Sequence, residues 1–402
     1  MDLYHFPRDL EQWIEEVAGA EDGDERAVCA AVRSLSDLFV GQGAWQPEYS
    51  RSPQLRRAYL RYYLPVNLPK IRVPLADWLC TDPRRFAVGR LRCLDLGSGP
   101  GTALLGLCDF LRGLPPEQRP QSLDLVALEQ SYESLKDAEA LLGWFAARFP
   151  EPAISFEPLR LDLVNDRADL FPLAASKGAF DLVIAANVLC ELDRGSPQGP
   201  SRAEALVTAA AERLLAADGA ILIIEPGLRE TSRKLHRLRD RLLARGQLHV
   251  HSPCLHESPC PALGTDRDWC IADLAWEPPA IVRTIERRTG LRKGSLKFSY
   301  LVLAREQPSA PEPSRWRVVS DVLELKGERR VYLCADGRWI VLGQLQRDRA
   351  ASGETFSRLR RGDLIEVAGM KPAGAMFRLP PTGTVRRITT VVGTPVTAIP
   401  AG

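Results

Sequence analysis

Apolar residues in the first eighty positions recur at a helical spacing. The two clearest sets are Leu10, Trp13, Ile14 and Val17, and then Val28, Val32, Leu35, Leu38 and Phe39. Intervals of three and four residues place such side chains on one face of a helix. The pattern therefore predicts a helical N-terminal region over residues 1–80.

Residues 81–306 instead alternate short apolar runs with helical stretches. This alternation is typical of strands and helices built around a mainly parallel sheet. The predicted strands are Arg92–Leu96, Ser122–Leu128, Ser155–Leu161, Phe180–Ala185, Gly219–Ile224, Gln247–His251 and Leu296–Ala304. The pattern predicts an α/β domain with a doubly wound, Rossmann-like sheet of seven strands.

A proline-rich segment, Gln307–Ser314, separates this domain from the rest of the chain. Beyond it, residues 315–402 contain short β-rich runs, such as ERRVYLCA and RWIVLGQL, broken by Lys-Gly, Asp-Gly and Gly-Asp turn signals. We predict a small C-terminal domain that resembles a β-barrel of the OB type.

The charge balance narrows the choice of partners. The 53 Lys and Arg residues and 51 Asp and Glu residues leave a net charge of +2, so any basic surface for nucleic acid must be local. The longest apolar runs, such as Ala220–Ile224, fall far short of the roughly 18 residues that cross a bilayer. The opening residues lack a basic leader with an apolar core. We expect a cytoplasmic protein with no membrane or DNA partner.

A glycine-rich turn follows the first predicted strand, in the segment CLDLGSGPGT over 93–102. The candidate cofactor-binding residues are Asp95, Gly97, Ser98, Gly99 and Gly101. Glycines at the start of a helix let the backbone approach a ligand closely. The acid at the strand end would repel a pyrophosphate but can accept from a ligand ammonium. This arrangement resembles the first motif of class I S-adenosylmethionine-dependent methyltransferases.

Polar residues also follow the next three strands. Glu129 ends the second strand, where an acid can accept from both ribose hydroxyls. Asp162 follows the third strand and can meet an adenine amino group, or serve only as a turn or cap acid. Asn187 lies at the carboxyl edge of the sheet, on the side expected to face the methyl donor. The acid or amide followed by Pro-Pro and an aromatic residue, typical of amino-methyltransferases, is absent here, so no catalytic residue is assigned.

Four cysteines stand apart from those in apolar runs. Cys254, Cys260 and Cys270 lie in a polar loop over 252–272, and Cys334 lies in the C-terminal β region. The loop is too polar to form a core, so a metal site is the simplest way to hold it. Zinc usually binds short CxxC knuckles, whereas wide spacing suits an iron–sulfur cluster. The alternative is a zinc ion held by three of these cysteines and a histidine such as His256.

The order of several motifs is similar to that of the methyltransferase-like small-ribosomal-subunit family of mitochondria and bacteria. The motifs are GSGPGT, ANVLCEL, PCLHESPCP, DWC, LKFSYLVL and a final cysteine before a β domain. The resemblance covers most of residues 50–340. It implies a class I methyltransferase fold, S-adenosylmethionine, binding to the small ribosomal subunit, and a [4Fe-4S] cluster. The cluster ligands that it implies are Cys254, Cys260, Cys270 and Cys334.

Two arginine-rich stretches are candidates for contact with RNA. Residues 51–72 interleave basic residues with Tyr59, Tyr62 and Tyr63, and residues 229–245 contain seven basic residues. Each could also be a solvated helix face. Our first hypothesis is a ribosomal RNA methyltransferase of the small subunit. The alternative is a non-catalytic assembly factor that binds this RNA and keeps S-adenosylmethionine and the cluster as structural or sensing ligands.

Overall fold

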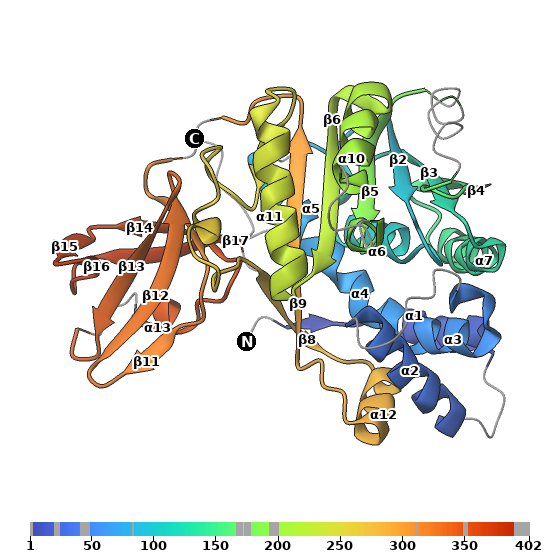
Figure 1. Ribbon diagram of the computed structural model, residues 1–402, viewed down its shortest axis with the longest axis horizontal. Coiled ribbons are helices and arrows are strands. Elements are labelled where there is room, and N and C mark those ends of the chain that lie inside the picture. The colour runs from blue at the N-terminus through green and yellow to red at the C-terminus, as the bar shows by residue number, and fades with distance from the viewer. Residues whose placement is uncertain are drawn as a thin grey trace.

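The computed structural model describes residues 3–19, 25–40, 49–82, 84–165, 172, 178–192, 201–309, 312–348 and 353–389. The N-terminal helices and the central sheet form one body, and the C-terminal strands lie at one side of it (Figure 1). Residues 390–402, the end of the predicted C-terminal domain, lie outside the described residues.

The central sheet contains all seven predicted strands. They are β2 (Arg90–Leu96), β3 (Ser122–Glu129), β4 (Ala153–Arg160), β5 (Phe180–Ala186), β6 (Leu215–Pro226), β7 (His249–Ser252) and β9 (Ser295–Ala304). The order is β4-β3-β2-β5-β6-β9, in which β9 runs antiparallel to β6 and the others run parallel. The order reverses at β2, so the loops after β2 and β5 open a crevice at the carboxyl edge.

Two further strands make this a nine-stranded sheet rather than one of seven. β8 (Ala272–Glu277) pairs antiparallel with β9, and β1 (Tyr4–His5) pairs parallel with β8. β1 is only two residues long, and β8 follows the polar cysteine loop directly. Their hydrogen bonds depend on partners far away in sequence, which is why the local apolar pattern does not predict them.

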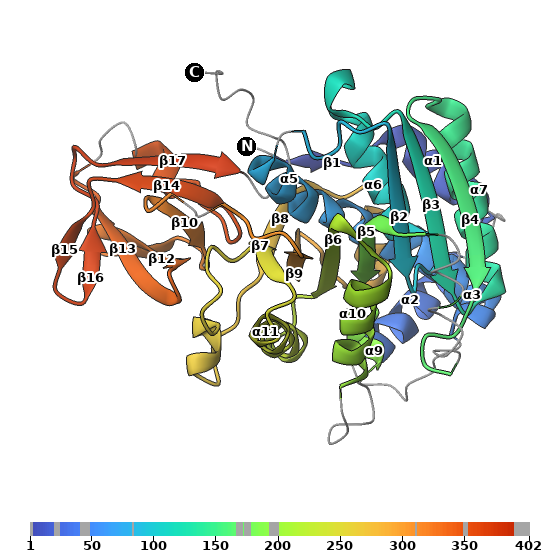
Figure 2. The ribbon, with the colours of Figure 1, turned by 90° about the horizontal axis from the view of Figure 1, so that it is seen from above.

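Helices cover both faces of the sheet, as the predicted doubly wound fold requires (Figure 2). The N-terminal helices are α1 (Arg8–Ala18), α2 (Glu25–Phe39), α3 (Pro53–Ala58), α4 (Leu64–Asn67) and α5 (Arg72–Thr81), with a π turn Tyr59–Tyr63 and a 3-10 turn Leu68–Ile71. They share a core with α6 (Thr102–Arg112), α7 (Tyr132–Arg148) and α12 (Ala280–Thr289). The other core contains α10 (Arg202–Arg213) and α11 (Arg229–Ala244), with the short α9 (Leu189–Leu192).

The C-terminal domain is an eight-stranded sheet with its own apolar core. Its strands are β10 (Arg315–Val318), β11 (Leu323–Leu325), β12 (Glu328–Ala335), β13 (Arg338–Leu345), β14 (Leu364–Ala368), β15 (Lys371–Ala373), β16 (Met376–Arg378) and β17 (Thr384–Thr389). A short helix, α13 (Gly353–Ser357), precedes β14. Pairing runs along the path β15-β16-β13-β12-β10-β14-β17, with β11 beside β12. The β-rich domain is confirmed, and its closure into a barrel stays a prediction.

Candidate functional site

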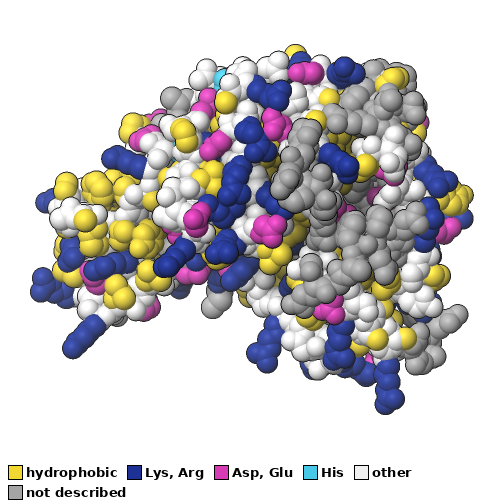
Figure 3. All heavy atoms as spheres, viewed as in Figure 1, with side chains coloured by type: hydrophobic (Ala, Val, Ile, Leu, Met, Phe, Trp, Pro, Cys, Tyr) yellow, Lys and Arg dark blue, Asp and Glu magenta, His cyan; other side chains and the backbone are white. Residues whose placement is uncertain are grey.

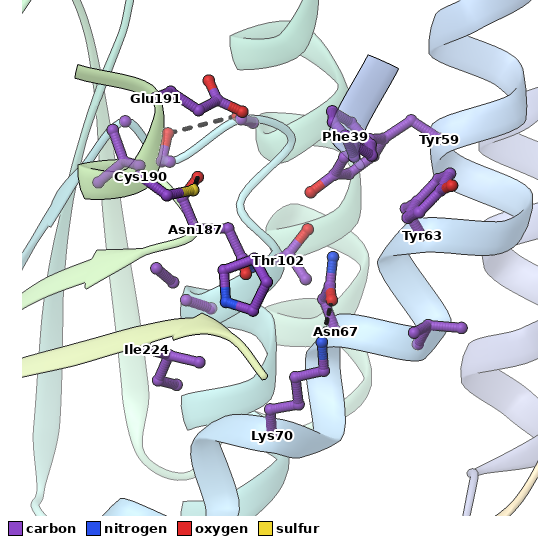
Figure 4. A pocket seen from close by; sticks show the side chains of 18 of the residues that line it. Phe39, Tyr59, Tyr63, Asn67, Lys70, Thr102, Asn187, Cys190, Glu191 and Ile224 are labelled. Carbon is purple, nitrogen blue, oxygen red and sulfur yellow. Dashed lines mark hydrogen bonds between the residues drawn. The ribbon is translucent and has the colours of Figure 1, made fainter. Parts of the chain in front are cut away.

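A cavity of about 970 Å³ opens at the carboxyl edge of the sheet, between the strand ends and the N-terminal helices (Figure 4). It is lined by all eight residues predicted to bind the cofactor except Gly101, which packs behind it. The other side of the cavity contains Phe39, Tyr59, Tyr63, Asn67, Lys70 and Lys293. The structure thus joins the predicted strand-end residues to a wall that the sequence analysis did not assign.

All three glycines of the turn share a backbone conformation that favours glycine, but they differ in what surrounds them. Gly97, Gly99 and Gly101 have φ of 70°, 53° and 74°, which side chains rarely adopt. A Cβ on Gly97 would lie 2.6 Å from Val188 Cγ2, and one on Gly101 would lie 3.1 Å from Ala138 Cβ. A Cβ on Gly99 would meet no protein atom within 4 Å. Gly99 therefore leaves backbone open to the cavity, while the other two glycines allow close packing.

Glu129 holds the glycine turn against the end of β3. Its carboxylate accepts from the backbone N–H of Gly99 at 3.0 Å and from that of Ser131 at 2.9 Å. Burial raises the pKa of Glu129, although these backbone donors act in the opposite direction. A carboxylate fixed in this way retains acceptor capacity for a ligand hydroxyl.

Asp95 is the most deeply buried acid of the cavity, with 1% of its surface exposed. Its Oδ2 has no hydrogen-bond partner among the described residues. Burial, and then the nearby charge of Glu129, raise the pKa of Asp95 to about 8. An unpaired buried carboxylate is costly, so this position favours a ligand that donates to it.

Asp162 and Asn187 also line the cavity, and both are fixed by hydrogen bonds within the protein. Asp162 Oδ1 accepts from the backbone N–H of Val164 at 2.8 Å, and its Oδ2 accepts from the Asn165 side chain at 2.8 Å. Asp162 therefore caps a turn, as the alternative interpretation expected, and this turn also borders the cavity. Asn187 has a φ of 58°, and its N–H donates to Ile224 O at 2.7 Å. Asparagine is among the few residues that adopt this conformation readily.

Glu225 positions the backbone of the cavity-lining residue Cys190, and the sequence analysis did not single it out. It is 2% exposed at the end of β6, and it accepts from the N–H groups of Leu189 and Cys190 at 3.0 and 3.2 Å. It therefore fixes the start of α9, directly after Asn187. The sequence signal for Glu225 was a single acid at the end of an apolar strand.

The N-terminal wall of the cavity was also missed. Lys70 is 7% exposed, and its ammonium donates to Asn67 Oδ1 at 2.7 Å (Figure 4). Burial raises the pKa of Tyr59 to about 12, and the nearby Thr102 and Asn67 side chains offset part of this rise. The available signal was a lysine inside the apolar run VNLPKI.

The four predicted cluster cysteines come together between the two domains. Cys254 packs against the core of the large sheet, and its neighbour Leu255 packs against the C-terminal core. Burial raises the pKa of Cys334, and so do the adjacent thiols Cys254, Cys270 and Cys260. Burial also raises the pKa values of Cys260 and Cys270 to about 12 each. His256 Nε2 lies 3.7 Å from Cys334 Sγ.

Two buried arginines of α11 shape the cysteine loop. Arg233 Nη1 donates to the carbonyl oxygens of Ala262, Thr265 and Asp268 at 3.0, 2.6 and 2.7 Å. Arg239 donates in the same way to His256 and Ser258. The guanidinium groups of α11 thus fix the backbone of the cysteine loop.

The loop is further fixed by contacts to the N–H groups of two cysteines. Cys270 N–H donates to His236 Nε2 at 3.0 Å, and Cys260 N–H donates to Asp240 at 3.0 Å. Burial lowers the pKa of His236 to about 4, so its ring is neutral and can accept. Within the described ranges, no group of three or more His, Cys, Asp or Glu side chains is placed to hold a metal ion.

Two of the three tyrosines in the stretch 51–72 are not available for the base stacking that its composition suggests. Tyr62 and Tyr63 are buried, and Arg72 pairs with the buried Asp109 at 3.0 Å. Further ion pairs join Arg56 to Glu133 and Asp137, and Arg61 to Glu15. Stacking of RNA bases on Tyr62 and Tyr63 was a wrong expectation, because helix packing turns both rings into the core. Phosphate contact by the remaining basic residues of this stretch stays a prediction.

The second arginine-rich stretch keeps a basic surface. Its exposed members are Arg229, Lys234, Arg237, Arg241 and Arg245, on α11 and just after it. Figure 3 shows basic side chains in a stripe down the middle of this face of the molecule. Arg241 and Arg245 both pair with Glu204, at 2.6 and 2.8 Å.

Comparison with known proteins gives one family and several distant structures. The family model described as mitochondrial small ribosomal subunit Rsm22 matches residues 90–363, which is more than half of the chain. No curated protein matches. One similar structure is an S-adenosylmethionine-dependent methyltransferase from Thiobacillus denitrificans in complex with S-adenosylhomocysteine (12% identity, 58% of this chain and 92% of that chain, TM-score 0.31).

Two other structures show comparable similarity. A class I S-adenosylmethionine-dependent methyltransferase from Listeria monocytogenes has 11% identity over 76% of this chain and 91% of that chain, with a TM-score of 0.36. The rRNA methyltransferase aviRa from Streptomyces viridochromogenes has 16% identity over 38% of this chain and 73% of that chain, with a TM-score of 0.25.

Proposed function

The chain belongs to the Rsm22 family of mitochondrial small ribosomal subunit proteins, and on this premise we propose that it binds S-adenosylmethionine and acts on small-subunit ribosomal RNA. The observation that carries the donor site is the buried, unpaired Oδ2 of Asp95 beside the open backbone of Gly99. Together they offer an acceptor for an ammonium and room for a ligand against the glycine turn.

The donor would be held by side chains at the ends of four adjacent strands, β4, β3, β2 and β5. Asp95 accepts from its ammonium, and Glu129 accepts from its ribose hydroxyls. Asp162 and Asn187 border the adenine and methyl ends of the cavity. When bound, the sulfonium group supplies an electrophilic methyl for transfer to a nucleophile.

Isothermal calorimetry with S-adenosylhomocysteine tests this site. We expect wild-type protein to bind it, and Asp95→Asn and Glu129→Gln each to bind at least tenfold more weakly, since each change removes a charged acceptor. Lys136→Met, on the exposed face of α7, is the control and should bind normally. Absence of binding by wild type, or full binding by both acidic-site variants, would place the donor elsewhere.

The alternative, a non-catalytic assembly factor, is favoured by one observation. The strand-end segment Asn187–Cys190 lacks the Pro-Pro and aromatic residues that position an amine acceptor in amino-methyltransferases. A map of methylated small-subunit RNA nucleotides from wild-type and Asp95→Asn cells separates the two. Loss of one methyl group supports the enzyme, whereas an unchanged map with an assembly defect supports the factor.

We also propose that Cys254, Cys260, Cys270 and Cys334 ligate a [4Fe-4S] cluster. The support is the proximity of four half-buried thiols to one another and to two buried guanidinium groups. The pKa of Arg239 is raised, because the nearby Cys254 and Asp240 outweigh the opposite effect of burial. The pKa of Arg317 is also raised, and Cys270 is one of the groups that raise it. Such cations would compensate the negative charge of a thiolate-ligated cluster.

Iron analysis of protein purified without oxygen tests the cluster. We expect about four irons per chain, a brown colour bleached by dithionite, and loss of iron in Cys334→Ser. Cys190→Ser, a half-buried thiol outside this group, should retain iron. One zinc per chain would instead support the alternative with His256, and full iron in Cys334→Ser would remove this cysteine from the ligand set.

The basic face of α11 is the proposed contact with ribosomal RNA. Arg229, Lys234 and Arg237 are exposed on one helix, and such a row suits phosphate binding. Arg237→Glu should weaken binding to small ribosomal subunits and reduce its salt dependence. Lys136→Glu is the matched charge reversal on α7 and should bind like wild type. Equal loss in both variants would indicate bulk charge alone.

For the compartment we keep the cytoplasm as the proposal, with mitochondria as the alternative that the family description favours. Among the described helices, none is long and apolar enough to span a membrane. Fractionation of cells that express the tagged protein, followed by detection with the small ribosomal subunit of each compartment, distinguishes the two.

A further inference from the structure

The donor cavity contains one buried acid and one buried base that do not pair with each other. Asp95 Oδ2 has no hydrogen-bond partner, and Lys70 donates only to the neutral side chain of Asn67 at 2.7 Å, as far as the chain is described. Among the described residues, no ion pair with a carboxylate is found for the Lys70 ammonium. Both residues line the cavity and are at most 7% exposed.

The surroundings make each unmatched charge costly. Burial and the nearby ammonium of Lys293 lower the pKa of Lys70 to about 7. Burial and the nearby carboxylate of Glu129 raise the pKa of Asp95 to about 8. A ligand that presents an anion to Lys70 and a cation to Asp95 would therefore relieve two penalties at once.

The position of Lys70 is set by close packing beside the glycine turn. Its 3-10 turn lies so close to α6 that a Cβ on Gly106 would be 2.6 Å from Leu68 O. Thr102, one turn earlier in α6, directly follows the glycine turn and lines the cavity together with Asn67 and Lys70. Lys70 thus lies beside the first turns of α6, the helix that begins at the proposed donor site (Figure 4).

We propose that Lys70 binds the carboxylate of the amino acid end of the donor, while Asp95 binds its ammonium. This rests on the proposed S-adenosylmethionine site and names the residue that recognises the second charge of the ligand. An ammonium has three donors, and Asn67 uses one, so two remain for the carboxylate oxygens. The N-terminal helices thereby supply part of the donor site.

Calorimetry with two ligands tests the proposal. S-adenosylhomocysteine carries the charged amino acid end, whereas 5′-methylthioadenosine lacks it. Lys70→Met should weaken binding of the first ligand at least tenfold and leave binding of the second within about twofold. Binding of methylthioadenosine also shows that the variant is folded, and Lys70→Gln is the substitute if it is not. Lys136→Met, at an exposed lysine of α7 outside the cavity, should preserve both affinities.

Proton exchange provides a second readout that a purely structural role would not change. In wild type, ligand binding moves Asp95 toward its ionised form and Lys70 toward its protonated form, so proton uptake at Lys70 offsets part of the release at Asp95. Without Lys70 the net release of protons should be larger, which calorimetry in buffers of different ionisation enthalpy detects.

The possible failures differ. Equal binding of S-adenosylhomocysteine by wild type and Lys70→Met overturns this proposal alone. So does an equal loss of both ligands in a folded variant, because Lys70 would then not act on the carboxylate. If wild type binds neither ligand, the proposed donor site is wrong, and the role of Lys70 is wrong with it.

Discussion

Arg317 and Asp77 form a buried ion pair, with Nη2 and Oδ2 2.8 Å apart and 4% of each side chain exposed. Arg317 belongs to β10 of the C-terminal domain and Asp77 to α5 of the N-terminal region. Tyr300 of β9 donates to the same Asp77 oxygen at 2.6 Å, and Arg317 Nε donates to Pro253 O of the cysteine loop at 2.9 Å. One pair therefore joins the three predicted regions and the candidate cluster loop.

Breaking this pair should loosen the C-terminal domain. Asp77→Asn leaves the guanidinium of Arg317 buried without its counter-charge, which should lower the free energy of unfolding by about 3–5 kcal/mol. Urea unfolding measures the loss, and limited proteolysis should cut the C-terminal strands first. Lys234→Ala removes an exposed pair with Glu230 and should cost less than about 1 kcal/mol. Equal costs in the two variants would contradict the role of the pair.

Gly337 should be essential to the contact between the C-terminal domain and the cysteine loop. It lies in the turn between β12 and β13 at a φ of 70°, and an added Cβ would be 2.8 Å from Ser258 Cβ. Gly337→Ala should therefore be more destabilising than Gly374→Ala, whose φ is 67° and whose Cβ would meet nothing within 4 Å. Thermal unfolding compares them. Backbone strain of about 1–2 kcal/mol is common to both, so equal melting temperatures would refute the steric contact.

The stability of the ligand-free protein should depend on pH through Asp95. Its pKa is raised from 3.8 to about 8 by burial, so the folded state binds this proton more tightly than the unfolded state. The contribution of Asp95 is therefore most favourable below about pH 4 and is lost as the pH rises to about 8. Asp95→Asn should gain stability relative to wild type between about pH 5 and about pH 8. Urea unfolding at both pH values checks this, and a constant difference would contradict it.

Gly99→Ala should separate ligand binding from folding. Its Cβ would meet no protein atom within 4 Å, so only the strain at a φ of 53° acts on the fold. Gly290→Ala is the control, with a φ of 78°, equally open space and a place outside the cavity. Both should lose about 1–2 kcal/mol of stability, but only Gly99→Ala should bind S-adenosylhomocysteine more weakly, by about tenfold or more. Unchanged affinity would show that the ligand does not approach this backbone.

The carboxyl-edge half of the cavity lining could be predicted because it is local in sequence. Asp95 and the glycine turn lie in ten consecutive residues, and Glu129 and Asn187 each follow a recognisable strand. Parallel strands then bring their carboxyl ends to one edge, whatever the details of packing. Lys70 could not be predicted, because nothing near it in sequence shows that its segment packs against α6.

The sequence by itself determined the α/β class, the seven apolar strands, the helical N-terminal region and the glycine turn, since periodicity and backbone conformation are properties of contiguous residues. Only the tertiary structure decided where isolated polar residues lie. It added β1 and β8 through hydrogen bonds to distant partners, and it buried Tyr62 and Tyr63 although their neighbours are basic. The physical reason is that burial and charge pairing depend on which surfaces meet, and a local pattern does not specify that.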